Sequence, residues 1–312
     1  MEVANQEQAP VDIMNKAVIL ALSKRYIGTT KSVRPDKVKI VKESESQVDT
    51  DARWMSTSKT LFSSKKLWDI YAADTRIDNL LTKYCLPSVI RRSNTRILPA
   101  ALVPEVDAIL VAHLEERERM VEEFCSPEEY ESAIAKAKEK LGPLWNEEDY
   151  LPLDVVRKQF AYSWQYLEFN VSSQLKTISA DILKREQKKL EEHWVEAGNS
   201  IRALLRANMA DLVSHMAERL SPTADGKKRV FKTSSLTNIQ DFIATFDARN
   251  LSGDTDLKAL VDKVQALTKG LDPELLRGDE SMRINTQKQF ESVKTELDKL
   301  VIAGPSRFIE LE

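Results

Sequence analysis

The fold is decided by residues 172–220, whose sequence is SSQLKTISADILKREQKKLEEHWVEAGNSIRALLRANMADLVSHMAERL. Apolar residues recur there at steps of three and four, which places them on one face of an α-helix. Only Gly198 interrupts the helix formers, and Ser221-Pro222 closes the run. At 1.5 Å per residue such a helix would span on the order of 70 Å, so it must pack against another long helix, within the chain or in a partner. The candidate packing interface comprises Ile182, Leu190, Trp194, Ile201, Leu205 and Leu212.

The composition of the chain indicates the mainly α class. Its 312 residues are 42% hydrophobic and 30% charged, and 8 glycines and 11 prolines are few for a sheet-rich protein. The helix at 279–302 is a natural antiparallel partner for 172–220. We therefore predict an elongated bundle of long antiparallel coiled-coil-like helices. The other expected helices cover 56–85, either continuous or broken near Asp74, and 104–124, 127–141, 236–246 and 255–269.

Strand signals are confined to the N-terminal part of the chain. Residues 16–40, KAVILALSKRYIGTTKSVRPDKVKI, combine an apolar run, β-branched residues and a Gly-Thr-Thr turn signal. We predict a small two-stranded β-ribbon there, with a helix over 13–26 as the alternative. Residues 88–104 contain several arginines, with three prolines in or beside them, and are predicted to form a loop.

Aromatic residues are concentrated in 144–171, which holds 7 of the chain's 21. We interpret this segment as core at the junction of long helices. An RNA-stacking platform is the alternative, and it is disfavoured because Arg157 and Lys158 are the segment's only basic residues. The charged run at 115–119 is interpreted as the solvated outer face of the helix that begins near Pro104.

Charge is distributed unevenly along three consecutive regions. Residues 1–100, with the ribbon and one helix, hold 17 Lys and Arg against 11 Asp and Glu, whereas 101–150 hold 5 against 14. The two segments of opposite sign could therefore meet within the fold or between subunits. The second region, 101–232, would be the long-helix core with its aromatic junction, and the third, 233–312, would supply helices that pack on the long helix.

No catalytic, cofactor or metal motif is present in the sequence. His113, His193 and His215 are far apart and are interpreted as helical surface residues. There is no Gly-rich phosphate loop and no GxSxG, so we predict a protein that is not an enzyme and takes no cofactor or metal. Cys85 and Cys125 show no disulfide framework and are expected to be reduced.

A cytoplasmic location is expected. The first residues, MEVANQEQAPVD, lack the basic and apolar order of a signal peptide, and no run approaches about 18 uninterrupted apolar residues. A membrane-active helical toxin would need a concealed apolar hairpin, for which only 97–114 is a candidate. Glu105, Asp107 and His113 argue against it.

Basic groups are the alternative candidate site. Those within 24–42, 65–66 and 91–96 could form a surface that contacts phosphates without reading sequence, if they converge on one face. A chain with 30% charged residues also scatters such residues by default. The candidate contacts are Lys24, Arg25, Lys31, Arg34, Lys37, Lys39, Lys65, Lys66, Arg91, Arg92 and Arg96.

The order of features in the first 170 residues resembles that of a helical family of unknown function. The resemblance rests on AVILALSKRYIGTTKSV, FSSKKLWDIYAADTRIDNLLTKYCLPS, RILPAALVPEVDAILVAHLEERERMVEEF and FAYSWQYLEFNV, and it covers roughly half of the chain. Family members occur in bacteria, phages and plasmids, some encoded beside MoxR-type AAA+ ATPases and von Willebrand A-domain proteins. The resemblance implies a phage- or mobile-element-linked intracellular protein that works with other subunits. It carries no functional residue over, since none is established for the family.

These observations favour a non-enzymatic interaction or assembly protein. Its long helices would bind a protein partner or a second copy of the chain, and helix packing would supply the affinity. The alternative is a nucleic-acid-associated accessory protein that uses the basic groups.

Overall fold

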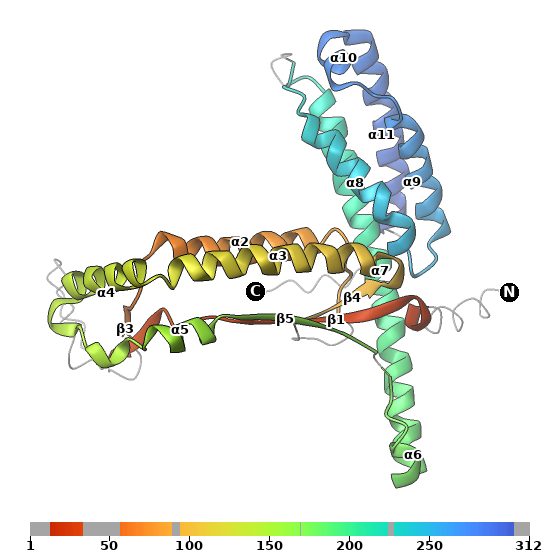
Figure 1. The fold of residues 1–312 in the computed structure, drawn as a ribbon. Coiled ribbons are helices and arrows are strands. Elements are labelled where there is room, and N and C mark those ends of the chain that lie inside the picture. Colours follow the sequence, from red (N-terminus) through yellow and green to blue (C-terminus); the bar gives the residue numbers. More distant parts are fainter. Residues whose placement is uncertain (1–12, 34–56, 89–93, 169, 224–227, 303–312) are drawn as a thin grey trace, which may run out of the picture. The chain divides into compact units, whose positions relative to one another are not determined.

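The computed structural model describes residues 13–33, 57–88, 94–168, 170–223 and 228–302 (Figure 1). Helices predominate among them and a small antiparallel sheet accompanies the helices, so the mainly α prediction is confirmed. No helix in the described ranges is long and apolar enough to cross a membrane.

The chain divides into two compact units, each built from separate segments. Unit 1 comprises Met1–Ala21, Leu80–Val106 and Gln165–Glu312, and unit 2 comprises Leu22–Asn79 and Asp107–Trp164. The three regions predicted above follow the chain in order, whereas these units do not.

Unit 1 is organised around α7, Ala180–Leu220, a helix of 41 residues. It begins later than predicted, because Ser179 is extended and its Oγ accepts the amide of Ile182 as an N-cap. A separate short helix, α6, precedes it. The other helices of this unit are α6 Leu175–Ile178, α8 Thr233–Arg249, α9 Thr255–Thr268, α10 Pro273–Gly278 and α11 Glu280–Ile302.

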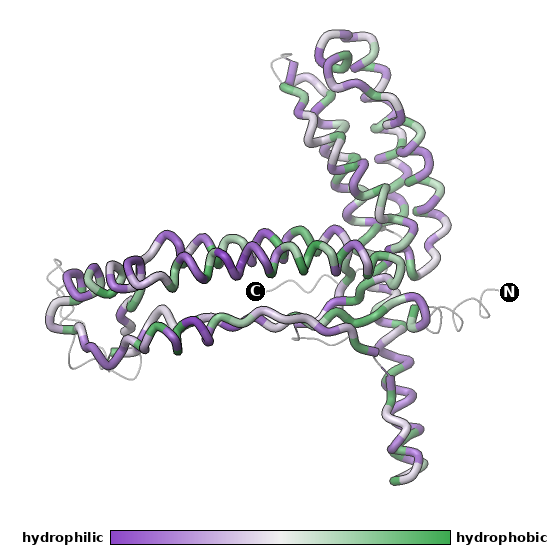
Figure 2. Tube along the Cα trace, viewed as in Figure 1, coloured by the Kyte–Doolittle hydropathy of each residue, from purple (hydrophilic) through white to green (hydrophobic). Residues whose placement is uncertain are grey.

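Helix α11 is the antiparallel partner of α7, as predicted. Arg283, at the start of α11, donates from Nε to the carbonyl of Leu220 at the end of α7, at 2.9 Å. Arg206, in the middle of α7, donates from Nη1 to the carbonyl of Leu300 near the end of α11, at 3.0 Å. Hydrophobic and hydrophilic residues alternate along these helices, as amphipathic packing requires (Figure 2).

The core of unit 1 lies among α7, α8, α9 and α11: α8 and α11 pack on the inner face of α7, and α9 packs on α8 and α11. Ile13 and Ile19 join this core from the N-terminal segment. Gly198 allows Ile13 to approach closely, since a Cβ at that position would lie 3.1 Å from Ile13 Cδ1. The interruption in the α7 sequence is therefore a packing site.

The strands differ from the predicted ribbon in their pairing. β1, Ala17–Arg25, and β2, Thr30–Val33, are strands, but they do not pair with each other. β1 lies at the centre of a sheet of order β4-β1-β5, and Ile19 faces Ile97 in its antiparallel register with β4. β2 pairs instead with β3, Thr57–Thr60. The rest of the proposed ribbon, 34–40, lies outside the described residues.

Two strands occupy segments that were predicted otherwise. β4, Thr95–Pro99, replaces part of the expected loop, and β5, Ala161–Leu167, lies within the aromatic segment. Tyr162, Trp164 and Tyr166 alternate with polar residues, which is the period of a strand. The aromatic density concealed that period.

Unit 2 contains the second set of helices. α2 begins later than expected because β3 takes residues 57–60, and Asp74 does not break it. The predicted cap of α4 is confirmed, since Ser126 Oγ accepts the amide of Glu129. The rings of Phe62, Phe124 and Tyr130 contact one another within its core in T-shaped and tilted arrangements. The helices are α2 Lys65–Leu81 and α3 Val103–Phe124, each with a few residues in unit 1, α4 Pro127–Leu141 and α5 Leu153–Gln159. 3-10 turns cover Gly142–Leu144 and Glu147–Asp149, and a further one, Ala100–Leu102, belongs to unit 1.

Candidate functional site

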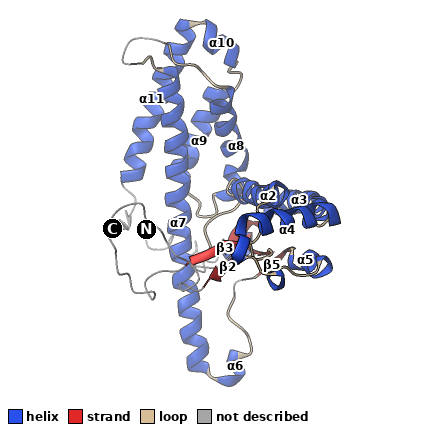
Figure 3. Ribbon diagram, turned by 90° about the vertical axis from the view of Figure 1, so that its left-hand side faces the viewer, coloured by secondary structure: helices blue, strands red, loops and turns tan. Residues whose placement is uncertain are grey.

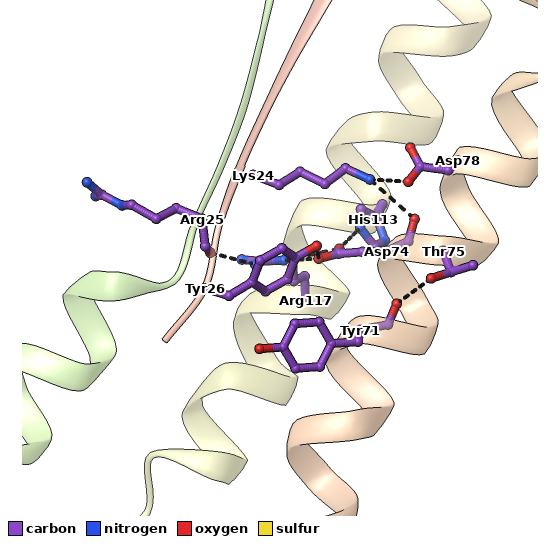
Figure 4. A network of polar contacts seen from close by, with 9 residues as sticks. All are labelled: Lys24, Arg25, Tyr26, Tyr71, Asp74, Thr75, Asp78, His113 and Arg117. Atoms are coloured by element: carbon purple, nitrogen blue, oxygen red, sulfur yellow. Dashed lines mark hydrogen bonds and ion pairs between the residues drawn. The ribbon is translucent and has the colours of Figure 1, made fainter. Parts of the chain in front are cut away.

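A buried polar network in unit 2 is centred on Asp74 of α2. Its carboxylate accepts bonds from Arg117 Nε at 3.1 and 3.0 Å and from the Tyr26 hydroxyl at 2.6 Å. His113 Nε2 lies 2.8 Å from the same carboxylate. Figure 4 shows these side chains converging between α2 and α3. Asp74, His113 and Arg117 are each no more than 4% exposed, so the network is internal.

Further groups surround the network. Lys24 Nζ donates to Asp78 at 2.5 Å and to the Asp74 carbonyl at 3.5 Å. The guanidinium of Arg117 lies 5.6 Å from the ring centroid of Tyr162 and 6.0 Å from that of Phe160. Aromatic faces thus shield the charge from water and attract it.

Electrostatics favour the ionised form of the central carboxyl. Burial alone would raise the pKa of Asp74, but hydrogen bonds from His113 and Tyr26 and the charge of Arg117 outweigh burial and lower the pKa. Burial and the bond to Asp74 raise the pKa of Tyr26. Asp74 is therefore an anion and Tyr26 a neutral donor at neutral pH.

This network corrects two sequence predictions. His113 was expected on the surface and is 4% exposed, and Arg117 was expected on the outer face and is 2% exposed. Both lie on the apolar face of α3, at steps of three and four from Leu110. The spacing from Leu110 could have predicted that His113 and Arg117 are buried. The position of Asp74 among apolar residues could likewise have predicted a buried partner for them. The arrangement joins α2, α3 and the residue that follows β1, because its central groups are buried and bonded to one another.

A second buried ion pair lies in unit 1. Arg206 of α7 presents its Nε and Nη2 edge to Asp254, at 2.6 and 3.0 Å. Asp254 also caps α9 by accepting the amide of Leu257 at 3.1 Å. Burial would raise the pKa of Asp254, but the bonds from Arg206 and Leu257 lower it. The pair fastens α7 to the start of α9.

Another arginine of unit 1 is buried without such a partner. Arg249, the last residue of α8, is 2% exposed, and its guanidinium lies 5.7 Å from the ring centroid of Phe242. Neither its Nε nor its Nη2 has a hydrogen-bond partner among the described residues. It lines a pocket of about 280 Å³. The other lining residues are Thr82, Lys83, Asn208, Asp211, Leu212, Asn238, Asp241 and Phe242.

The described basic candidates are held by acidic or carbonyl groups of the chain. Arg25 donates to the carbonyl of Lys158 at 3.4 Å, and Arg96 also interacts within the chain. Four lysines form ion pairs: Lys24 with Asp78, Lys31 with Asp149, Lys65 with Asp69 and Lys66 with Glu129. Arg34, Lys37, Lys39, Arg91 and Arg92 lie outside the described residues.

Some basic residues of the first hundred positions form ion pairs with the acidic segment 101–150 within unit 2. Lys31 and Lys59, from the basic first hundred residues, both contact Asp149 of the acidic segment. Lys66 reaches Glu129 in the same segment. Burial would raise the pKa of Asp149, but the two lysines lower it. Basic and acidic segments therefore meet within one chain at these positions.

The predicted helix interface is largely an internal surface. Trp194, Ile201 and Leu205 are buried in the core of unit 1, and Leu190 and Leu212 pack at its margin. Ile182 is partly exposed and lies outside this core. The stripe is therefore used within the chain over most of its length and is uncovered near the start of α7.

Cys85 and Cys125 are buried and free, and burial raises the pKa of each thiol to about 11. Among the described residues no group of three His, Cys, Asp or Glu side chains could hold a metal ion. Comparison of the chain with protein-family models, with curated proteins and with solved structures gives no match.

Proposed function

We propose that this protein is a non-enzymatic assembly protein that binds an amphipathic helix of another protein along the start of α7. The observation that carries the proposal is the uncovered stretch 175–193, comprising α6 and the first turns of α7, which we call the arm. None of its residues is buried, and Ile178 is 70% exposed. In two views α6 lies beyond the ends of α8, α9 and α11 (Figures 1 and 3).

The arm continues the face of α7 that the rest of unit 1 covers. Leu183 and Leu190 are seven residues apart, and Trp194, Ala197 and Ile201 follow at steps of three and four. The last three are buried, whereas the two leucines are only partly so. Most helical stability in a protein comes from packing of an amphipathic face, so a partner helix along this face would stabilise the first turns of α7.

We take a helix of another protein, rather than a second copy, as the occupant. Helix geometry places Lys184 beside the Leu183–Leu190 ridge, and Lys184 makes no ion pair with the described residues. On the other border of the ridge Glu186 is already engaged by Lys189, at 2.8 Å. A partner helix with an apolar ridge flanked by acidic residues would meet Lys184 with opposite charge. The resemblance of the N-terminal half to a family that works with other subunits agrees with this reading and suggests a phage or mobile-element origin.

The test measures the mass of the protein in solution and its binding to a synthetic helical peptide. We expect the purified chain to be monomeric by light scattering. It should bind a synthetic helical peptide with a leucine ridge flanked by glutamates more tightly than the same ridge flanked by lysines. Leu183→Asp should weaken binding of the glutamate peptide by at least about tenfold, because a charge would enter the apolar contact.

The matched control is Val195→Asp on the opposite face of α7, where Val195 is 47% exposed. This variant should bind the glutamate peptide as the parent chain does. Equal loss in both variants, or no binding of either peptide, would overturn the proposal. A wild-type dimer that Leu183→Asp converts to a monomer would assign the arm to self-association instead.

A further inference from the structure

The pocket beside Arg249 has the chemistry of a receptor for a small molecule. It lies between the turn after α2, residues 82–83, and helices α7 and α8, all within unit 1. Its volume of about 280 Å³ is just below the range typical of drug-sized ligands, so a small metabolite fits it better. Phe242 and Leu212 supply apolar wall, and Asn208 and Asn238 supply amide groups.

The unpartnered edge of Arg249 is the edge that binds carboxylates. Nε–H and one N–H of Nη2 point in parallel, at a spacing that matches the two oxygens of a carboxylate. Arg206, in the same unit, uses its Nε and Nη2 in this way on Asp254. On Arg249 the same two atoms are buried and without a partner in the described structure.

Nearby groups of the chain do not neutralise Arg249. Cys85 interacts with it electrostatically, but burial raises the pKa of that thiol to about 11, so it is neutral at physiological pH. Asp241 lines the pocket and is engaged by Lys83 at 2.7 Å. That pair is 46% and 41% exposed, and exposed pairs of this kind are weakly held, so it can open for a ligand.

An acidic group on the same pocket is also unengaged. Asp211 of α7 lines it, is exposed, and makes no hydrogen bond or ion pair with the described residues. One pocket thus offers a buried cation that lacks an anion and an anion that lacks a cation. A ligand bearing both charges would satisfy the two together.

We propose that this pocket binds a small zwitterion of the α-amino-acid type. The Nε and Nη2 edge of Arg249 is closed to water in the empty pocket, and a ligand reaches it when the exposed Lys83–Asp241 pair opens. The ligand's carboxylate then pairs with this edge, and its ammonium group faces Asp211. Phe242 and Leu212 contact the ligand's side chain. This inference is independent of the arm, since no arm residue lines the pocket.

The first experiment measures ligand-induced thermal stabilisation of the full chain. Each of the natural amino acids is added at about 10 mM, well above a millimolar dissociation constant, because a ligand that binds only the native state raises Tm. The deaminated acid and the carboxamide of any hit are added in parallel. We expect at least one amino acid to raise Tm, and both analogues to bind more weakly than that amino acid. Failure of every amino acid to raise Tm would overturn the proposal.

Variants then assign the two charges by calorimetric titration. Arg249→Met should weaken binding of the hit by at least about tenfold, and Arg249→Lys should also weaken it, since an ammonium group lacks the fork. Asp211→Asn should weaken the amino acid but not its deaminated analogue. The control is Asp262→Asn on α9, whose carboxylate pairs with Lys258 and does not line this pocket.

Three outcomes of these experiments are distinguishable. Unchanged binding by Arg249→Met, checked for native circular dichroism, would overturn the site. Equal binding of the amino acid and its deaminated analogue, with no effect of Asp211→Asn, would show a plain carboxylate site and overturn the zwitterion assignment. Loss in both pocket variants with an unaffected Asp262→Asn would support the proposal.

Discussion

Two buried charges, Asp74 in unit 2 and Arg249 in unit 1, differ in whether they are paired. In unit 2, the Asp74 carboxylate collects bonds from Tyr26 and Arg117 and lies 2.8 Å from His113 Nε2. In unit 1, Arg249 is as deeply buried as Arg117, at 2% exposure each, but its Nε and Nη2 have no partner among the described residues. A buried charge is costly unless it is paired.

This difference separates a structural role from a binding role. A fully paired cluster joins its elements and has little left to offer a ligand. An unpaired buried cation at a pocket lowers the stability of the empty protein, and a ligand can recover that loss. The comparison therefore predicts that removing charge from the two places changes stability with opposite sign.

The largest effect is expected at Asp74. Asp74→Ala leaves Arg117 and His113 buried without their acceptor, so we expect the free energy of unfolding to fall by about 3–5 kcal/mol. Urea denaturation followed by circular dichroism measures it. The control is Asp69→Ala, which removes an exposed partner of Lys65 on the same helix and should cost no more than about 0.5 kcal/mol. A loss below about 1 kcal/mol at Asp74 would show that the network does not hold unit 2 together.

The next largest effect is expected at Arg206. Arg206→Met leaves Asp254, which is 2% exposed, with the amide of Leu257 but without its cation, and we expect a loss of about 2–3 kcal/mol. The same denaturation experiment measures it. Arg185→Met, nearer the start of the same helix, is the control because the Arg185 side chain is 65% exposed and is held only by an ion pair with Glu186 at 3.6 Å. Equal stability of the two variants would contradict a structural role for the Arg206 pair.

Elements that depend on neighbouring residues could be predicted from the sequence, whereas pairings between distant residues could not. The periodicity of α7 and the cap of α4 are local, and both predicted elements exist. The pairing of β1 with β4 depends on residues more than seventy positions apart, so the ribbon was assigned to the wrong partner. A single sequence does not encode such pairing in any local pattern.

The candidate sites show the same division. Arg117 could have been found, because it lies on the apolar face of α3 and that face can be traced by spacing. Arg249 lies on the inner face of α8, seven residues after Phe242, which is also readable. Helical spacing could not predict the partners of the two arginines. Arg117 binds Asp74, whereas the Nε and Nη2 of Arg249 bind no group in the described structure.

A smaller effect is expected from pH. The pKa of Asp74 is lowered in the native state, so its contribution is present above the unfolded value near 3.9 and is lost as pH falls through the native pKa. The difference in unfolding free energy between the parent chain and Asp74→Asn should therefore shrink below about pH 4. Denaturation at pH 7 and at steps down to about pH 3 measures this. A constant difference would contradict an ionised Asp74.

The smallest change in the free energy of unfolding is expected at Arg249. The sign of that change is the most informative of the four. Methionine keeps an unbranched apolar stem against Phe242 and removes a guanidinium that lacks partners for two of its nitrogens. Loss of the contact with the ring offsets part of the gain. Arg249→Met should therefore leave the free energy of unfolding unchanged or raise it by up to about 1 kcal/mol, measured in amino-acid-free buffer. A loss above about 1 kcal/mol would place Arg249 with Arg117 and Arg206 as a structural arginine. A neutral or stabilising result would mean that its burial is not explained by folding, which is the condition that a ligand site requires.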